Sequence, residues 1–155
     1  MKIEISREID NEKWDSMVDS FCGSIFHMSV WAKFIAIRQP NSTPLFFTLL
    51  DDSGNVIGCA LGFKDCSKNR LKSYLNCHLW FDSMPLVLAS DHSIECAFLN
   101  MIQEYALRHG YASMSFGSFA SSDLGDCLTS LHFSKKESLE FVVSLECSEE
   151  SNYAG

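Results

Sequence analysis

Residues 71–80 carry side chains suited to acid–base chemistry, in alternation with apolar ones. The side chains of a β-strand alternate between its two faces. If this stretch is a strand, one face holds Leu71, Ser73, Leu75, Cys77 and Leu79. The other face holds Lys72, Tyr74, Asn76, His78 and Trp80. We expect the first face to pack on a core and the second to meet solvent or a ligand.

His78 and Tyr74 on the polar face are candidates for a proton acceptor, because a general base works best with a pKa near the working pH. Lys72, Asn76 and Trp80 would then line an acceptor cleft. The competing interpretation is an ordinary solvated strand face. Tyrosine, histidine and tryptophan together are unusual on a purely solvated face, so the functional interpretation stays open beside the simpler one.

Trp31 and Lys33 form a second candidate group for substrate binding. The Lys33 ammonium can bind a phosphate or a carboxylate as a point charge. The simpler interpretation is that Trp31 anchors its helix in the core while Lys33 lies in water, since large aromatic residues beside apolar helical stripes usually pack.

The cysteine pattern predicts neither a metal site nor a disulfide scaffold. The seven cysteines are odd in number and scattered, and no Cys-x-x-Cys pair occurs. Cys77 and His78 would point to opposite faces of their strand. We expect no bound metal, a reduced cytoplasmic environment, and cysteines that serve as small core residues. The sequence contains neither a Gly-x-Ser-x-Gly elbow nor a P-loop.

The charge and hydropathy of the chain exclude several classes of protein. The 155 residues include 12 Lys and Arg against 20 Asp and Glu, a formal net charge of −8, so no specific nucleic-acid site is expected. No apolar run approaches the roughly 18 residues of a membrane span, and charges stand where a signal peptide would be apolar. With 46% hydrophobic residues, residues 1–146 are expected to form one domain and 147–155 an acidic tail or linker.

Hydrophobic periodicity predicts the elements that position these residues. Strands are expected at residues 3–5, 45–50, 56–63, 71–80, 112–116 and 139–145. Helices are expected after Asp10, from Ser29 with Val30, Phe34 and Ile37 on one face, after Ser90 or Asp91 up to Gly110, and after Ser122 or Asp123. This order predicts an α+β domain with a mixed, mostly antiparallel sheet flanked by helices. The second hairpin strand places Gly58, Ala60 and Gly62 on one face, which lets another group approach the backbone closely.

This order resembles the GNAT acyltransferase fold, and four short motifs resemble its FemAB-type branch, the aminoacyl-tRNA-dependent peptidoglycan bridge transferases. Residues 23–33 are similar to that family's "ifqs-x-x-Wa-x-x-K" segment, and residues 80–87 to its aromatic-x-x-x-Gly-Pro-Val turn. Residues 106–111 are similar to its helix end, and residues 131–133 to a Leu-Gly-Phe. Met84 and His132 stand where that pattern has glycine.

The resemblance implies acyl or aminoacyl transfer to the amine of a small-molecule or cell-wall precursor, near Trp31 and Lys33. Acyl-CoA and aminoacyl-tRNA are the donors it implies, and a homodimer or a second GNAT-like domain the partners. Residues 86–92 lack the glycine loop with which coenzyme-A-dependent members hold pyrophosphate at a helix N-terminus.

Three hypotheses remain open on the sequence. The first is a GNAT-fold, FemAB-like acyl- or aminoacyl-transferase domain. The second is a non-catalytic binding domain of the same fold, which exposed Trp80 and Phe81 would favour as a contact patch. The third is an acetyl-CoA N-acetyltransferase without its glycine loop.

Overall fold

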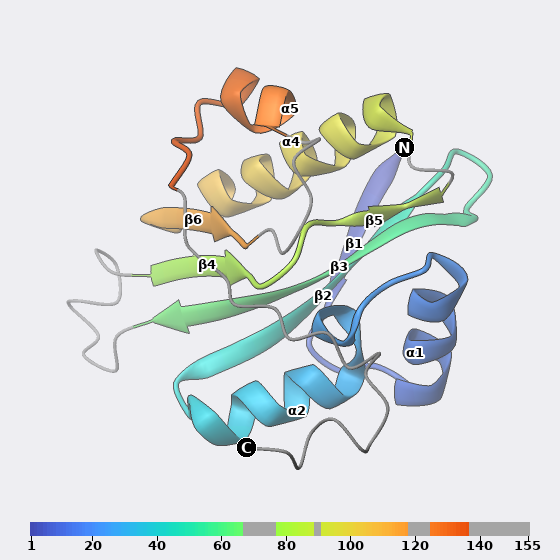
Figure 1. Ribbon diagram of the computed structural model, residues 1–155, viewed down its shortest axis with the longest axis vertical. Helices are drawn as coiled ribbons and strands as arrows, with labels where there is room; N and C mark the ends of the chain where they lie inside the picture. Colours follow the sequence, from blue (N-terminus) through green and yellow to red (C-terminus); the bar gives the residue numbers. More distant parts are fainter. Residues whose placement is uncertain (67–76, 89–90, 118–124, 137–155) are drawn as a thin grey trace, which may run out of the picture.

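A computed structural model of the protein describes residues 1–66, 77–88, 91–117 and 125–136 (Figure 1). The strands are β1 (Lys2–Ser6), β2 (Ser42–Leu50), β3 (Val56–Cys66), β4 (Cys77–Phe81), β5 (Leu86–Val87) and β6 (Ser113–Phe116). The helices are α1 (Asn11–Ser20), the 3₁₀ turn η1 (Ile25–His27), α2 (Ser29–Arg38), α4 (His92–Arg108) and α5 (Gly125–Ser130).

The strands form one sheet in the order β1-β2-β3-β4-β6, with β5 paired to β3. Each neighbouring pair from β1 to β4 is antiparallel, whereas β4 and β6 run parallel. The predicted fold class is therefore confirmed: a mixed, mostly antiparallel sheet flanked by helices. Two features were not predicted, namely the parallel pairing of β6 with β4 and the short strand β5.

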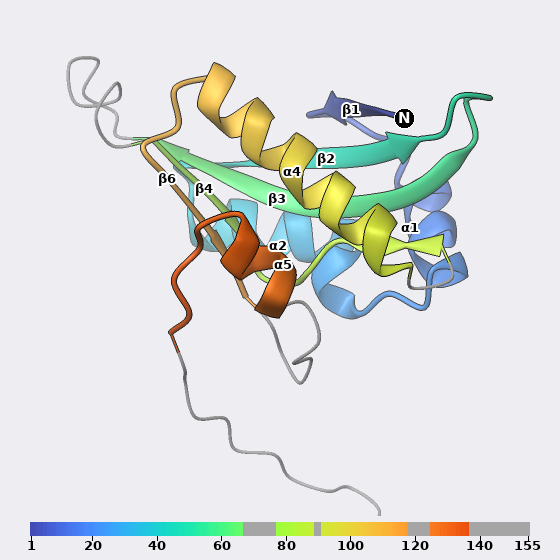
Figure 2. The same cartoon turned by 90° about the horizontal axis from the view of Figure 1, so that it is seen from above.

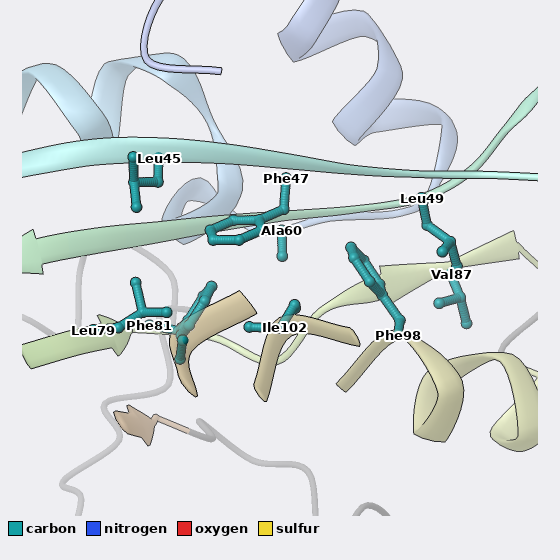
Figure 3. Packing of buried hydrophobic residues seen from close by; sticks show 10 residues of the cluster. Leu45, Phe47, Leu49, Ala60, Leu79, Phe81, Val87, Phe98 and Ile102 are labelled. Carbon is teal, nitrogen blue, oxygen red and sulfur yellow. The ribbon is translucent and has the colours of Figure 1, made fainter. Parts of the chain in front are cut away.

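Helices cover both faces of this sheet (Figure 2). On one face, α4 packs Phe98 and Ile102 against the inward side chains of the strands (Figure 3). Ala106 of α4 belongs to the same cluster. On the other face, α1 contributes Trp14 and Val18, and α2 contributes Ala32 and Ile35. The strand residues alternate between the two clusters, so Phe47 belongs to the α4 side and Phe46 to the other side.

The glycine face of β3 receives parts of the protein itself. A Cβ atom added to Gly62 would lie 2.5 Å from Cε1 of the Phe81 ring, and one added to Gly58 would lie 2.8 Å from the carbonyl oxygen of Leu86. The group that approaches the backbone at β3 is therefore the aromatic ring of β4 at one point and the backbone of β5 at the other.

Helix starts follow the local sequence closely. Asp10 caps α1 by accepting from the backbone N–H groups of Glu12 and Lys13, and Asp91 caps α4 by accepting from those of Ser93 and Ile94. Gly110, with φ +69°, ends α4 as predicted. His132 has φ +65°, so it adopts the left-handed conformation that the glycine of the resembled motif would supply without strain.

Helix α2 lies where it was expected but faces the other way. Ser29, Ala32 and Ile35 are its buried residues. Val30, Phe34 and Ile37 are exposed, with 52%, 43% and 82% of their surface accessible. Because nearly every position of this helix is apolar or small, the sequence pattern alone does not single out the face that packs.

The structure brings the sulfur atoms of Cys66 and Cys77 together, and those of Cys96 and Cys127, where the sequence favoured separate core thiols. Cys59 remains a buried free thiol, and burial raises its pKa to about 12, so it is not a nucleophile at neutral pH. The expected strand at 139–145, the strand residues 71–76 and the tail at 147–155 lie outside the described residues.

Candidate functional site

The described pairing of the parallel strands β4 and β6 ends at their carboxyl ends. They are paired from His78 and Ser113 to Phe81 and Phe116, and the Gly117 N–H donates to the Phe81 carbonyl oxygen at 2.7 Å. Beyond this point the chain from β4 turns away and pairs with β3 as β5 (Figure 1). Ligands of open sheets enter where neighbouring strands diverge at their carboxyl ends. We therefore take residues 82–85 and their surroundings, the β4–β5 loop, as the candidate site.

Met84 ties the β4–β5 loop to both helical layers. Its side chain is buried against Leu99 of α4 and Cys127 of α5. Its carbonyl oxygen lies 2.8 Å from His27 Nε2 on the opposite side of the sheet. The methionine in place of the glycine of the resembled motif therefore has a structural role, because it anchors the loop under α4 and α5.

His27 is a buried neutral imidazole that holds this loop. Its Nδ1 lies 3.1 Å from the backbone nitrogen of Ser24, which donates to it, so Nε2 carries the proton and donates to the Met84 carbonyl. Burial lowers the pKa of His27 below its ordinary value. The backbone is held as well, because Trp14 Nε1 donates to the His27 carbonyl oxygen at 2.7 Å.

Trp31 and Asp82 join α2 to the same loop. The indole Nε1 of Trp31 donates to Oδ2 of Asp82 at 2.6 Å. Burial raises the pKa of the Asp82 carboxyl, and the indole hydrogen bond partly opposes this shift. The Trp31 ring stacks on Phe34 at 5.0 Å and meets Phe26 edge-on at 4.9 Å. A carboxylate beside aromatic rings is suited to binding an alkylammonium group.

His78 lies one strand-length back from this loop, half-buried on the α1–α2 side of the sheet. Its Nδ1 lies 2.7 Å from Ser113 Oγ and its Nε2 3.0 Å from Ser115 Oγ, both on β6. A hydroxyl group rotates to donate or to accept. The two serines can therefore satisfy His78 in either tautomer and in the protonated form, which suits a group that takes up and releases a proton.

The remaining predicted site residues are spread over the fold. Trp80 is half-buried and stacks on Phe63 at 4.5 Å, and Phe81 is buried in the core, so these two form no exposed contact patch. Lys33 is exposed and lines a groove of about 410 Å³ with Arg7 and Pro44, away from the contacts of Trp31. Lys72, Tyr74 and Asn76 lie outside the described residues.

The N-terminus of α4 offers little room for a pyrophosphate group. The Asp91 carboxylate accepts from the Ser93 N–H at 2.9 Å and from the Ile94 N–H at 3.3 Å. These are the amide groups that a helix N-terminus would present to an anion. A pyrophosphate there would displace Asp91 or lie beside its negative charge, so the described residues do not fit the usual coenzyme A contact.

Sequence reasoning missed Asp82 and His27. Asp82 directly follows a strand that runs parallel to a distant partner, so its position at the site depends on a pairing that the local pattern does not reveal. His27 gave a weak signal, because it lies within the motif on residues 23–33. Among the described residues no group of three or more His, Cys, Asp and Glu side chains could hold a metal ion. In the same part of the chain no helix is long and apolar enough to cross a membrane.

Comparison with known proteins identifies the fold. No protein-family model matches the sequence, and neither does any curated protein. Among solved structures, the chain is similar to a ribosomal-protein-alanine N-acetyltransferase from Brucella melitensis, with a TM-score of 0.57, 11% identity, and 94% of this chain and 100% of that one covered.

Two further structures give the same result. One is an aminoglycoside N-acetyltransferase in complex with CoA, with a TM-score of 0.55, 14% identity, and 92% of this chain and 98% of that one covered. The other is a glucosamine-6-phosphate N-acetyltransferase from Arabidopsis thaliana, with a TM-score of 0.52 and 9% identity. The match covers 94% of this chain and 100% of that one. At these identities the likeness establishes the fold, which is that of the GNAT acetyltransferases.

Proposed function

We propose that the protein is a GNAT-fold N-acyltransferase that transfers an acyl group to an amine at the carboxyl ends of β4 and β6. The observation that carries the proposal is that two parallel strands end side by side, with Asp82 directly after β4 and His78 within it. The N-acetyltransferase structures of the same fold support acyl transfer as the class of reaction.

In the proposed reaction the amine nitrogen attacks the carbonyl carbon of an activated ester or thioester. The C–N bond forms, the C–O or C–S bond breaks, and the leaving alkoxide or thiolate departs with its electron pair. The amine must lose a proton, and His78 is the proposed acceptor. Because both of its ring nitrogens are hydrogen-bonded to serines, the proton would reach His78 through the hydroxyl of Ser113 or Ser115, which passes its own proton on to the ring. Asp82 binds a second, non-reacting ammonium group of the acceptor, and the fold contributes by holding the two reactants together.

The donor and the acceptor remain at the level of chemical class. The Asp91 cap disfavours acyl-CoA bound in the usual way and leaves an aminoacyl-tRNA ester as the other proposed donor. A FemAB-type acceptor, a cell-wall precursor amine, is proposed from the motif resemblance. One contact supports it: the two resembled motifs touch, since Trp31 bonds Asp82 and His27 bonds Met84. The matching location is the cytoplasm, which we also propose.

The proposal is tested with acetyl-CoA and an aminoacyl-tRNA as donors and with a lysine-containing UDP-muramyl peptide and spermidine as acceptors. Mass spectrometry detects acylated acceptor. We expect product with at least one pair, and a rate reduced about 10²–10⁴-fold in His78→Gln. His109→Gln is the matched control, because His109 is an exposed histidine at the far end of α4, and it should retain wild-type activity.

Two results would contradict this assignment. A His78→Gln variant as active as the control would remove His78 from the reaction, and Asp82→Asn would then be compared for the same role. The absence of product with every pair, together with no thermal stabilisation by either donor, would favour the second candidate function. That candidate is a non-catalytic interaction domain, and the exposed apolar side of α2 is the observation that favours it.

A further inference from the structure

Two cysteines meet where helix α5 lies against helix α4 (Figure 2). Cys96 is on α4 and Cys127 on α5, and their Cα atoms are 5.6 Å apart. Two cysteines at this separation can form a disulfide without movement of the backbone. Cys127 is 3% exposed, whereas Cys96 is half-buried, so part of its surface reaches solvent. The pair thus combines one accessible thiol with one protected thiol.

Two side chains at the start of α4 are placed to activate the accessible thiol. His92 Nε2 lies 3.7 Å from Cys96 Sγ, as positions i and i+4 on one helix face allow. On the other side of the ring, His92 Nδ1 lies 3.8 Å from Glu95 Oε2. An imidazole so placed takes the thiol proton, and a carboxylate beside it stabilises the resulting imidazolium. The three side chains therefore form a nucleophile, a base and an orienting carboxylate.

The surroundings of Cys96 differ from those of the other buried thiol. Burial is the cause that acts on Cys59, and it raises the pKa of that thiol to about 12. Cys96 instead combines partial exposure with a base in contact. The Asp91 carboxylate also lies at this end of α4, but it accepts from the N–H groups of Ser93 and Ile94, so the helix N-terminus balances its charge.

We infer that Cys96 and Cys127 form a redox-sensitive thiol pair that reacts with low-molecular-weight disulfides such as oxidised glutathione. The Cys96 thiolate attacks one sulfur of oxidised glutathione, a mixed disulfide forms, and one glutathione thiolate leaves. The Cys127 sulfur, on losing its proton, attacks the Cys96 sulfur, so that the Cys96–Cys127 bond forms and the second glutathione leaves. Two protein thiols are oxidised, one glutathione disulfide is reduced, and the two protons end on the two glutathione thiols.

This bond acts on the candidate site through Met84. The Met84 side chain packs against Leu99 of α4 and Cys127 of α5, so a bond between the two helices fixes the anchor of the β4–β5 loop. Reversible thiol pairs suit a reducing compartment, where the disulfides that form are transient. The inference does not depend on the proposed acyl transfer, because it concerns thiol chemistry alone.

The test incubates the reduced protein with oxidised glutathione, traps samples with iodoacetamide and quantifies linked peptides by mass spectrometry. We expect a peptide pair joined through Cys96 and Cys127, which excess reduced glutathione separates again. In Cys127→Ala the reaction should stop at the mixed disulfide on Cys96. In that background His92→Gln should slow the mixed disulfide about three- to tenfold at pH 7, and less at pH 9, where a thiol ionises without help. His109→Gln, at the far end of α4, is the matched control and should react like Cys127→Ala alone.

Three results would overturn the inference. The first is the absence of the Cys96–Cys127 peptide pair under conditions that modify Cys22, an exposed free thiol that shows the oxidant to be active. The second is a His92→Gln variant that reacts at Cys96 as fast as His109→Gln does at pH 7. The third is a bond that forms once and that reduced glutathione does not open, since this would be a permanent cross-link. Thermal unfolding of each variant confirms that it folds, and the oxidised wild type should melt several degrees above the reduced protein.

Discussion

The close contact between Gly62 and Phe81 makes Gly62→Ala a demanding test of the packing around β4. The added methyl group would lie 2.5 Å from Cε1 and 2.7 Å from Cζ of the Phe81 ring. That ring is 2% exposed and has little room to move, because Phe116 stacks on it at 4.5 Å and Phe47 lies 5.5 Å away. Overpacking of this kind costs about 1–3 kcal/mol.

Part of this cost is offset, because alanine restricts the unfolded chain more than glycine does, by about 0.4–1 kcal/mol. We therefore expect Gly62→Ala to lower the free energy of unfolding by about 1–2 kcal/mol. Urea unfolding followed by tryptophan fluorescence would register this as a midpoint lower by roughly 0.5–1 M.

A double-variant cycle separates the clash from other effects of the substitution. Phe81→Leu shortens the side chain that the new methyl group meets, so it should cost less in the Gly62→Ala background than in the wild type. Gly110→Ala is the control. The backbone at Gly110 has φ +69°, which strains an alanine, but no atom lies within 4 Å of the added methyl group, so this variant is destabilised without a clash. Phe81→Leu should not rescue Gly110→Ala. Equal costs of Phe81→Leu in all three backgrounds would refute the packing argument.

Three other residues give predictions that concern stability. Burial lowers the pKa of His27 below 6.5, so on acidification the unfolded chain takes up a proton before the folded chain does. The free energy of unfolding of the wild type should therefore fall as the pH drops below 6.5, by up to about 1.4 kcal/mol per pH unit. Urea unfolding at several pH values should show a shallower pH dependence for His27→Gln, and an unchanged one would contradict this. His132→Gly should raise the free energy of unfolding by about 1 kcal/mol, because φ +65° strains any residue with a Cβ, and a lower melting temperature would count against it. Asp91→Ala should lower stability by about 1 kcal/mol through loss of the α4 cap, whereas Asp91→Asn should keep most of it.

The features predicted correctly from the sequence are those that local physics controls. The Asp10 and Asp91 caps and the end of α4 at Gly110 depend on residues within a few positions of each other. The β2–β3 hairpin likewise follows from a turn between two apolar runs. Local geometry also explains why a glycine-type motif at His132 retains the glycine backbone conformation.

The features that were missed depend on distant parts of the chain. Because β6 pairs with β4 in parallel, the carboxyl ends of these two strands lie side by side. Asp82, directly after β4, lies at the candidate site only because of that pairing. The sequence likewise does not show which face of α2 points outward, because apolar residues lie on both sides of that helix. Contacts with the rest of the fold bury Ala32 and Ile35. His78 was singled out correctly as a polar side chain on β4, while its partners Ser113 and Ser115 are 35 and 37 residues away.

The strand pairs of the sheet differ in how far apart their two strands lie in the sequence. Strands β1 to β4 follow one another, apart from the helical segment between β1 and β2, whereas β6 reaches β4 only after α4 has crossed the sheet. Closing a longer loop costs more chain entropy before its contacts form. We therefore expect β6 to join the sheet late in folding and to leave it early on heating, with amide hydrogen exchange faster at Ser115 than at Phe47. The candidate site at the carboxyl ends of β4 and β6 would then lose its shape while the antiparallel strands still hold, so function would fail at a lower temperature than the fold.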